Sequence, residues 1–417
     1  MEVHATENQD LWVPLAQPYG GFVREMLGTQ RFPEVKLVAG QEIVRPYDVA
    51  AWSLPLMMGV TAESGTMPAK AARWTPGTSA AWAGTGAAAL VPGGAENARA
   101  VNAALRSGGR VTRTPTASRS AGGATWPAGT FFFDARAAAA AAGAASEGVG
   151  LAPLSGMPEG LPALKTPRVG LYKPWAASMD EGWTRWLLEQ YGFDPVPLDN
   201  ATILKGELRR AFDVILLPDV AKEIIATGKP KREEGEMTYF VELPPEYSGG
   251  LSEEGAKSLV AFVEAGGTIV ALSAASDYVI EQFNVPVLNS LGKAKPAEFA
   301  CPGSILRAQA TQDHPVTWGL PDEIGLFLDK PIVFETIPPA LSLGRRVLAR
   351  YPGDARDILL SGWISGAERL TRRAAAVALT YGKGKLVLLG FRPQNRAQTN
   401  GTFPFVFNSI YWSVMEG

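Results

Sequence analysis

The chain has 417 residues, of which 46% are hydrophobic and 19% are charged, and its formal net charge is -2. This composition predicts a soluble globular protein of two or three domains. The nearly balanced charge argues against a nucleic-acid partner, and the lack of an uninterrupted apolar stretch of about 18 residues argues against a membrane span.

Side chains that bind catalytic metals are scarce. The only cysteine is Cys301, and the only histidines are His4 and His314. A single cysteine can form neither an internal disulfide nor a cysteine-based zinc cluster. The HExxH pattern of zinc peptidases is absent, and the one HxxE spacing, His4 to Glu7, is followed by a single further histidine, His314. We therefore expect no metal site, no cofactor and no zinc-dependent hydrolysis by this chain alone.

Residues 1–75 are predicted to form an extended docking segment rather than a domain, with a short strand at 11–15 and a helical turn or two at 21–27. The first residues lack the basic and then apolar pattern of a signal peptide. The segment is rich in aromatic residues, namely Trp12, Tyr19, Phe22, Tyr47 and Trp52. Such residues usually lie in interfaces, so we expect contacts within this chain or with another chain, including a second copy.

Residues 76–165 are predicted to form a small α/β unit. Strands are expected at 87–91, 110–112 and 130–133, and helices at 97–107 and 136–145. The stretch 112–123 is rich in Thr, Ser, Arg and Gly, which predicts an exposed loop.

Residues 166–417 are predicted to form a doubly wound, mostly parallel α/β sheet of the flavodoxin-like kind. Apolar strands are expected at 168–172, 196–198, 213–217 and 268–272, alternating with helices that Ser178 and Ser252 are expected to cap. Such alternation is typical of parallel sheets with helices on both faces. Ser178 and Glu181 have the spacing of a capping box. The helix that they begin is expected to carry on one face Trp183, Trp186, Leu187 and Tyr191.

Beyond residue 302 the pattern changes to shorter strands around residues 305, 332, 347 and 358. A hairpin is expected from strands 374–379 and 386–389, because Gly382-Lys383-Gly384 lies between them. A final helix is predicted at 403–414.

Polar residues follow several predicted strands, at the edge where doubly wound sheets bind ligands. The candidates for a ligand pocket are Lys173, Trp175, Asp180 and Glu181 after the first strand, Asp219, Gly249 and Gly250 after the third, Ser273 and Asp277 after the fourth, and Arg392 after the hairpin. A guanidinium in this position could bind a carboxylate or phosphate, or could anchor the last helix or a neighbouring domain.

Ser273 has two interpretations. It lies between small residues at a predicted strand-to-helix turn, as a nucleophile elbow requires, although alanines replace the glycines of the GxSxG pattern. A serine hydrolase would also need a base, for which His314 is the candidate. Alternatively, Ser273 caps or packs the turn and Asp277 begins a helix, just as Asp180 favours a helix N-terminus. No catalytic residue is therefore assigned.

Four runs resemble the C-terminal half of large bacterial M14-family zinc carboxypeptidase-like proteins. They are RVGLY at 168–172, SMDEGWTRW at 178–186, PPEYSGG at 244–250 and GFRPQ at 390–394. Residues 13–19 and 45–52 resemble the stretch that follows the peptidase domain in those proteins.

This resemblance implies a class I glutamine-amidotransferase-like domain near 166–417 and a zinc-peptidase domain that the given sequence lacks. True amidotransferases have a cysteine at the elbow together with His and Glu, whereas the elbow here aligns with Ser273. We therefore expect a non-catalytic accessory region with a degenerate site that docks on a zinc-carboxypeptidase domain in cis or in trans. A serine hydrolase and a small-ligand-binding domain are the alternatives. Family members are commonly exported, so the resemblance implies a periplasmic or secreted location, which the residues themselves leave open.

Overall fold

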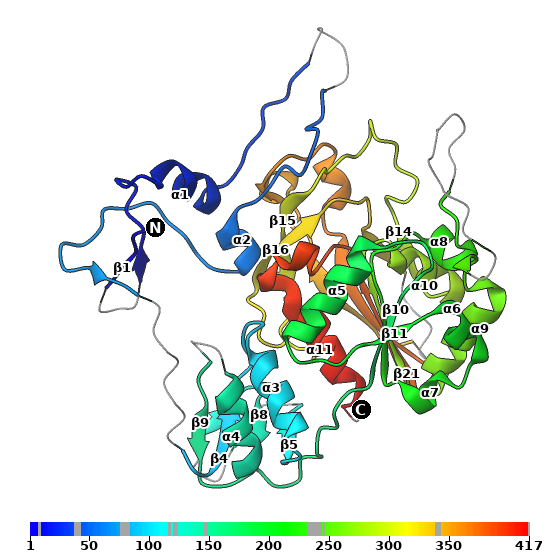
Figure 1. Cartoon of the computed structure of the whole chain (residues 1–417). Helices are drawn as coiled ribbons and strands as arrows, with labels where there is room; N and C mark the ends of the chain where they lie inside the picture. The colour runs from blue at the N-terminus through cyan, green and yellow to red at the C-terminus, as the bar shows by residue number, and fades with distance from the viewer. Residues whose placement is uncertain are drawn as a thin grey trace.

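The computed structural model describes residues 1–6, 10–36, 43–75, 84–115, 118–119, 124–145, 149–231, 244, 247–337 and 343–415. A large α/β body, a smaller sheet with two helices, and an N-terminal segment on the outside make up the chain (Figure 1). The predicted α/β class is confirmed. Within the ranges given, no helix combines the length and the apolarity needed to cross a bilayer.

The large sheet is mixed and has 12 strands. Its parallel portion contains, in spatial order, β11 (Val196–Leu198), β10 (Val169–Tyr172), β12 (Val214–Leu217), β13 (Thr268–Leu272) and β21 (Gly384–Leu389). The antiparallel portion continues through β20 (Ala374–Tyr381), β18 (Arg345–Arg350), β15 (Ser304–Ala310) and β16 (Glu323–Leu328). Three short strands attach to it, namely β14 (Val287–Asn289), β17 (Phe334–Thr336) and β19 (Leu359–Ser361). The predicted hairpin is therefore confirmed as β20 and β21, whereas β16 was not predicted.

Helices cover both faces of the parallel portion, which confirms the doubly wound arrangement. Side chains alternate along each strand, so Val214 and Leu216 of β12 face one core while Ile215 and Leu217 face another. The first core contains residues of α5 (Met179–Gln190) and α11 (Phe403–Ser413). The second contains residues of α6 (Asn200–Lys205), α7 (Leu208–Ala211), α8 (Lys222–Thr227), α9 (Ser252–Glu264) and α10 (Ala275–Phe283). Short 3-10 helices are η2 (Ala355–Asp357), η3 (Ala367–Leu370), η4 (Asn395–Ala397) and η5 (Asn400–Thr402).

Helix α5 has a different buried face from the one predicted. Trp183 and Trp186 are 38% and 47% exposed, whereas Asp180, Thr184 and Leu187 are buried. The face predicted to carry both tryptophans with Leu187 and Tyr191 is only half buried: Leu187 and Tyr191 are inside and the tryptophans are partly exposed, because buried polar contacts made by Asp180 and Thr184 set the rotation of the helix.

The two predicted serine caps have different outcomes. The hydroxyl of Ser178 accepts a hydrogen bond from the Glu181 N–H at 3.2 Å, so this half of the capping box is confirmed, whereas the Glu181 carboxylate pairs with Arg185 rather than with the Ser178 N–H. In α9 the N-cap residue is Leu251, and the hydroxyl of Ser252 instead donates to a side-chain oxygen of Glu254 at 2.6 Å. The predicted cap at Ser252 is therefore wrong.

The smaller sheet is antiparallel, with the order β5 (Val111–Arg113), β8 (Phe131–Phe133), β4 (Ala87–Leu90) and β9 (Ala152–Leu154). Its helices are α3 (Asn97–Arg106) and α4 (Ala135–Ala144). The hydrophobic core of this sheet continues into the large body across α11. A hydrogen bond joins the two parts, because the Tyr411 hydroxyl of α11 donates to Asn102 Oδ1 of α3 at 3.0 Å.

The predicted loop at 112–123 is wrong in its first part, because Thr112 and Arg113 are buried in β5. Further along, β6 (Ser118–Arg119) pairs with β7 (Thr125–Trp126). Residues 116–117 and 120–123 lie outside the described residues.

The N-terminal segment contains a three-stranded sheet of β1 (His4–Ala5), β2 (Leu11–Trp12) and β3 (Ala72–Arg73), and the helices α1 (Gly20–Leu27) and α2 (Leu54–Met58). Met57 of α2 packs with Ile305 and Phe327 of the large body. By contrast, Tyr19, Phe22 and Tyr47 are exposed. For those three aromatic residues the expected burial within this chain is wrong, and contact with another chain stays a prediction.

Candidate functional site

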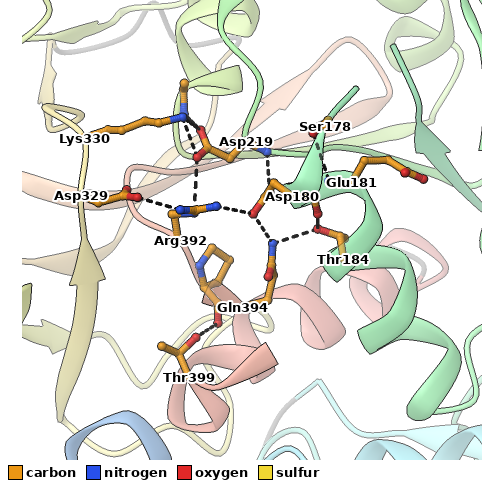
Figure 2. A network of polar contacts seen from close by, with 12 residues as sticks. Ser178, Asp180, Glu181, Thr184, Asp219, Asp329, Lys330, Arg392, Gln394 and Thr399 are labelled. Atoms are coloured by element: carbon orange, nitrogen blue, oxygen red, sulfur yellow. Dashed lines mark hydrogen bonds and ion pairs between the residues drawn. The ribbon is translucent and has the colours of Figure 1, made fainter. Parts of the chain in front are cut away.

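Three of the predicted site residues meet at the carboxyl edge of the parallel strands. Asp180 lies in the first turn of α5 after β10, Asp219 follows β12, and Arg392 follows β21 (Figure 2). Arg392 Nη2 is 3.1 Å from Asp180 Oδ1, and Arg392 Nε is 3.4 Å from Asp219 Oδ2. The three side chains therefore lie together at the edge where the sequence predicts a ligand pocket, and binding of a ligand there stays a prediction.

Two further charged residues complete this group, which we call the Arg392 cluster. Asp329 Oδ2 lies 2.7 Å from Arg392 Nη1, and Lys330 Nζ lies 2.7 Å from Asp219 Oδ2. Both residues follow β16, in the antiparallel portion of the sheet. These two residues were not predicted as site residues, because β16 itself was not predicted. In addition, ligands of doubly wound sheets bind at the carboxyl ends of parallel strands, and β16 is antiparallel.

The charges of the cluster largely compensate one another, because three carboxylates face two cations. Burial lowers the pKa of the Arg392 guanidinium, but the surrounding carboxylates, Asp329 foremost, outweigh burial and hold this pKa above its ordinary value. Burial raises the pKa of Asp329, and Arg392 offsets only part of that rise. The guanidinium thus stays charged and pairs with the carboxylates of its own chain, as an anchor for α5 and for the loop after β16.

A buried amide extends the cluster beneath α5. Gln394 Nε2 donates to Asp180 Oδ1 at 2.7 Å and to Thr184 Oγ1 at 3.0 Å. The Asp180 carboxylate also accepts a hydrogen bond from the Asp219 N–H at 2.7 Å. Because buried polar groups need partners, these bonds fix the face of α5 that points inward.

Ser273 occupies an elbow between β13 and α10. Its φ of 47° lies in the left-handed region, which residues other than glycine rarely adopt, and its side chain is 1% exposed. The Ser273 N–H donates to the carbonyl of Leu389 at 2.7 Å. Among the described residues, nothing forms a hydrogen bond with the Ser273 hydroxyl. The predicted turn therefore exists, but no base contacts its serine.

The backbone N–H of Ala274, the residue after Ser273, already has a hydrogen-bond acceptor. Ala274 donates its N–H to Asp219 Oδ1 at 3.1 Å. In hydrolases with such an elbow, the corresponding N–H stabilises the negative charge that develops on the substrate oxygen. Here a carboxylate occupies that position, so negative charge already lies where a reaction would create it.

His314 lies away from the elbow. Its ring packs 4.7 Å from the ring of Trp412, and burial lowers its pKa to about 4. The Trp412 carbonyl accepts a hydrogen bond from Lys385, which pairs with Thr268 at the start of β13. Ser273 follows the far end of that strand, which at roughly 3.3 Å per residue is about 16 Å away. The structure therefore does not bring the two residues of the serine-hydrolase hypothesis together.

Three other candidates after the first strand have local contacts. Lys173 has an exposed side chain, and its N–H donates to the carbonyl of Leu198 at 2.9 Å. The ring of Trp175 lies 5.5 Å from that of Tyr247. Glu181 pairs with Arg185 on its own helix at 2.7 Å. None of these contacts joins the Arg392 cluster.

The remaining candidates have contacts of the same local kind. The Gly249 carbonyl accepts a hydrogen bond from Asn200 Nδ2 at 2.9 Å, and Gly250 lies so close to the backbone of Ala226 that a side chain would not fit. Asp277 lies in the first turn of α10, where it accepts a hydrogen bond from Asn289 at 3.3 Å, and burial raises its pKa. Over the described ranges, no group of three or more His, Cys, Asp or Glu side chains is arranged to hold a metal ion.

No family model and no curated protein matches the chain. Similar solved structures include a putative GMP synthase protein from Thermoplasma acidophilum, with 11% identity over 59% of this chain and 95% of that chain and a TM-score of 0.35. PurLQS from Thermotoga maritima matches with 16% identity over 60% of this chain and 97% of that chain, at a TM-score of 0.34. A putative ThuA-like protein from Bacteroides uniformis matches with 12% identity over 60% of this chain and 91% of that chain, at a TM-score of 0.32.

The strand order β11-β10-β12-β13-β21 is that of a flavodoxin-like doubly wound sheet, and the amidotransferase-like domain that the sequence resemblance implies for residues 166–417 stays an expectation. None of the three descriptions above names a zinc carboxypeptidase.

Proposed function

We propose that this chain is a non-catalytic accessory region, built on an amidotransferase-like domain, that acts by binding another protein. The observation that carries the proposal is the hydrogen bond from the Ala274 N–H to the Asp219 carboxylate. An elbow of this kind cannot stabilise an oxyanion while a carboxylate accepts that N–H.

The blocking carboxylate is firmly held. Lys330 and Arg392 both pair with Asp219, whose side chain is 2% exposed. Its own N–H donates to Asp180 at 2.7 Å. Because moving Asp219 would separate buried opposite charges, substrate binding alone is a weak means of opening the site.

Exposed aromatic residues on α5 provide a surface for a partner. The rings of Trp183 and Trp186 pack edge to face, with their centres 6.1 Å apart. Met179, the first residue of the same helix, is also exposed. Tryptophan and methionine are enriched in the centres of protein interfaces. The sequence resemblance supports a zinc-carboxypeptidase domain as the partner, in cis or in trans.

Co-expression with such a domain tests the proposal. We expect the two to co-elute in size-exclusion chromatography with light scattering, and a double variant, Trp183→Ser with Trp186→Ser, to lose the complex. Leu204→Ser is the matched control, because Leu204 is an exposed apolar residue on α6, which packs on the opposite face of the sheet. A chain that stays separate from the peptidase domain would refute this partner.

The serine-hydrolase alternative is favoured by one observation, namely the left-handed backbone and unpartnered hydroxyl of Ser273. A fluorophosphonate probe distinguishes the two functions. Labelling of the wild type that Ser273→Ala abolishes would favour the enzyme, and an unlabelled wild type favours the accessory region. For the small-ligand-binding alternative, a thermal shift against peptides and amino acids is the direct measurement.

A further inference from the structure

A buried arginine lies between the smaller sheet and α11. Arg113 of β5 is 3% exposed. Its Nε donates to the carbonyl of Gly129 at 3.2 Å, and its Nη2 donates to Asn408 Oδ1 at 2.8 Å. The remaining nitrogen, Nη1, is buried and has no hydrogen-bond partner among the described residues.

Aromatic rings rather than a carboxylate surround this guanidinium. Its central carbon lies 4.6 Å from the ring centre of Phe131, 4.9 Å from that of Trp318 and 5.9 Å from that of Tyr411. No ion pair with Arg113 occurs within the part of the chain that the structure describes. Rings offset part of the cost of burying a cation, but they do not neutralise it. Burial accordingly lowers the pKa of Arg113 to about 9.

A small cavity of about 20 Å³ adjoins Arg113 and opens in part to solvent. The loop Pro92-Gly93-Gly94 lines it together with Asn97 and Ala98 in the first turn of α3. The N-cap residue of α3 is Glu96, whose carboxylate accepts hydrogen bonds from Arg99 and Tyr191, so the positive charge at the cavity comes from Arg113. Arg113, Trp318 and Asn408 also line the cavity.

We propose that this cavity is an anion-binding site in which a compact monovalent anion, either a halide or the carboxylate group of a small acid, pairs with Arg113. The anion accepts a hydrogen bond from Nη1 and supplies the countercharge that the described residues do not provide there. The site is separate from the Arg392 cluster, whose guanidinium is already paired with three carboxylates.

Iodide quenching of tryptophan fluorescence tests the site, because Trp318 is 6% exposed and lies beside Arg113. Collisional quenching of such a buried ring is weak, so a bound iodide gives a saturable component on top of the linear quenching of the other tryptophans by free iodide. We expect this component in the wild type and its loss in Trp318→Phe, which keeps the guanidinium. We also expect its loss in Arg113→Met, whereas Arg210→Met, at an exposed arginine, retains it.

Competition identifies the source of the anion. Displacement of iodide by acetate indicates the carboxylate of a small acid, and displacement by chloride but not acetate indicates a halide. Purely linear quenching in the wild type, or a saturable component that neither anion displaces, overturns the proposal. The wild type and Trp318→Phe both keep Arg113. The comparison of their saturable quenching therefore tests the proposal even where Arg113→Met fails to fold.

Discussion

Replacing Arg392 by glutamine is the most direct perturbation of the Arg392 cluster. The side chain is 17% exposed, and it pairs with Asp180, Asp219 and Asp329. In Arg392→Gln, those three carboxylates keep Lys330 as the only nearby cation of the cluster. The formal charge of the cluster therefore changes from -1 (two cations, three anions) to -2 (one cation, three anions).

Removing one partner of a buried ion pair costs about 3–5 kcal/mol, because the other charge is left buried and uncompensated. Glutamine retains hydrogen-bonding groups, and Asp329 is 22% exposed, so we expect a loss near 3 kcal/mol in the free energy of unfolding at pH 7. Denaturant titration followed by tryptophan fluorescence and circular dichroism measures this loss.

The loss should depend on pH. Burial already raises the pKa of Asp329 in the folded wild type, and removal of Arg392 raises it further. A carboxyl whose pKa is higher in the folded than in the unfolded state binds its proton more tightly when folded. Its contribution to stability is therefore gained as pH falls through the folded pKa and lost as pH rises through it. The difference between wild type and variant should thus shrink from pH 7 towards pH 5.

Arg210→Gln is the control, because Arg210 is 80% exposed and pairs with Glu207 on the surface. We expect its effect to stay within about 0.5 kcal/mol at both pH values. A loss below about 1 kcal/mol for Arg392→Gln, or a loss equally large at pH 5, would refute the view that the cluster is a buried, charge-compensated anchor.

Three further predictions concern other positions. Ser273→Gly should raise the free energy of unfolding by up to about 1 kcal/mol. Glycine adopts a φ of 47° without strain, and the substitution removes a buried hydroxyl that lacks a partner among the described residues. A lower stability in denaturant titration would contradict this prediction. Burial lowers the pKa of folded His314 to about 4 against an ordinary value near 6.5, so wild-type stability should fall by about 3 kcal/mol as pH drops through that window. A pH series on His314→Gln should lack this slope, and an unchanged slope would contradict a buried neutral imidazole. Trp183→Ser with Trp186→Ser should change the melting temperature little, since both side chains are partly exposed, and a large drop in a thermal scan would mean that the pair stabilises the fold rather than a complex.

The sequence predicted the parallel half of the fold well because its elements are locally encoded. Continuous apolar runs such as Val214–Leu217 become fully buried strands, and the turn at Gly382 joins β20 to β21. The face of α5 could not be predicted in this way. Its rotation depends on Gln394, which is 214 residues away from Asp180 in sequence. Periodicity favours apolar residues inside, and here buried polar bonds override it.

The candidate site was predicted in part for the same reason. Asp180, Asp219 and Arg392 each follow a strand that the apolar pattern indicates, so a topological rule brings them together. Asp329 and Lys330 follow an antiparallel strand with no such rule. Arg113 lies in a three-residue strand within a stretch whose composition predicts a loop, so nothing local indicates that its guanidinium is buried.

Closure of the elbow and exposure of the tryptophans have a common structural origin. Asp180 holds the N–H of Asp219, and Asp219 in turn accepts the N–H of Ala274. Asp180 can do so only if it faces inward, and on a helix this orientation turns Trp186 towards solvent, while Trp183, at the edge of the buried face, stays 38% exposed. A variant that releases Asp180 from the cluster should therefore open the elbow and disturb the aromatic surface together. If partner binding survives Asp180→Ala unchanged in a folded protein, the two features are independent and the accessory role does not depend on the closed site.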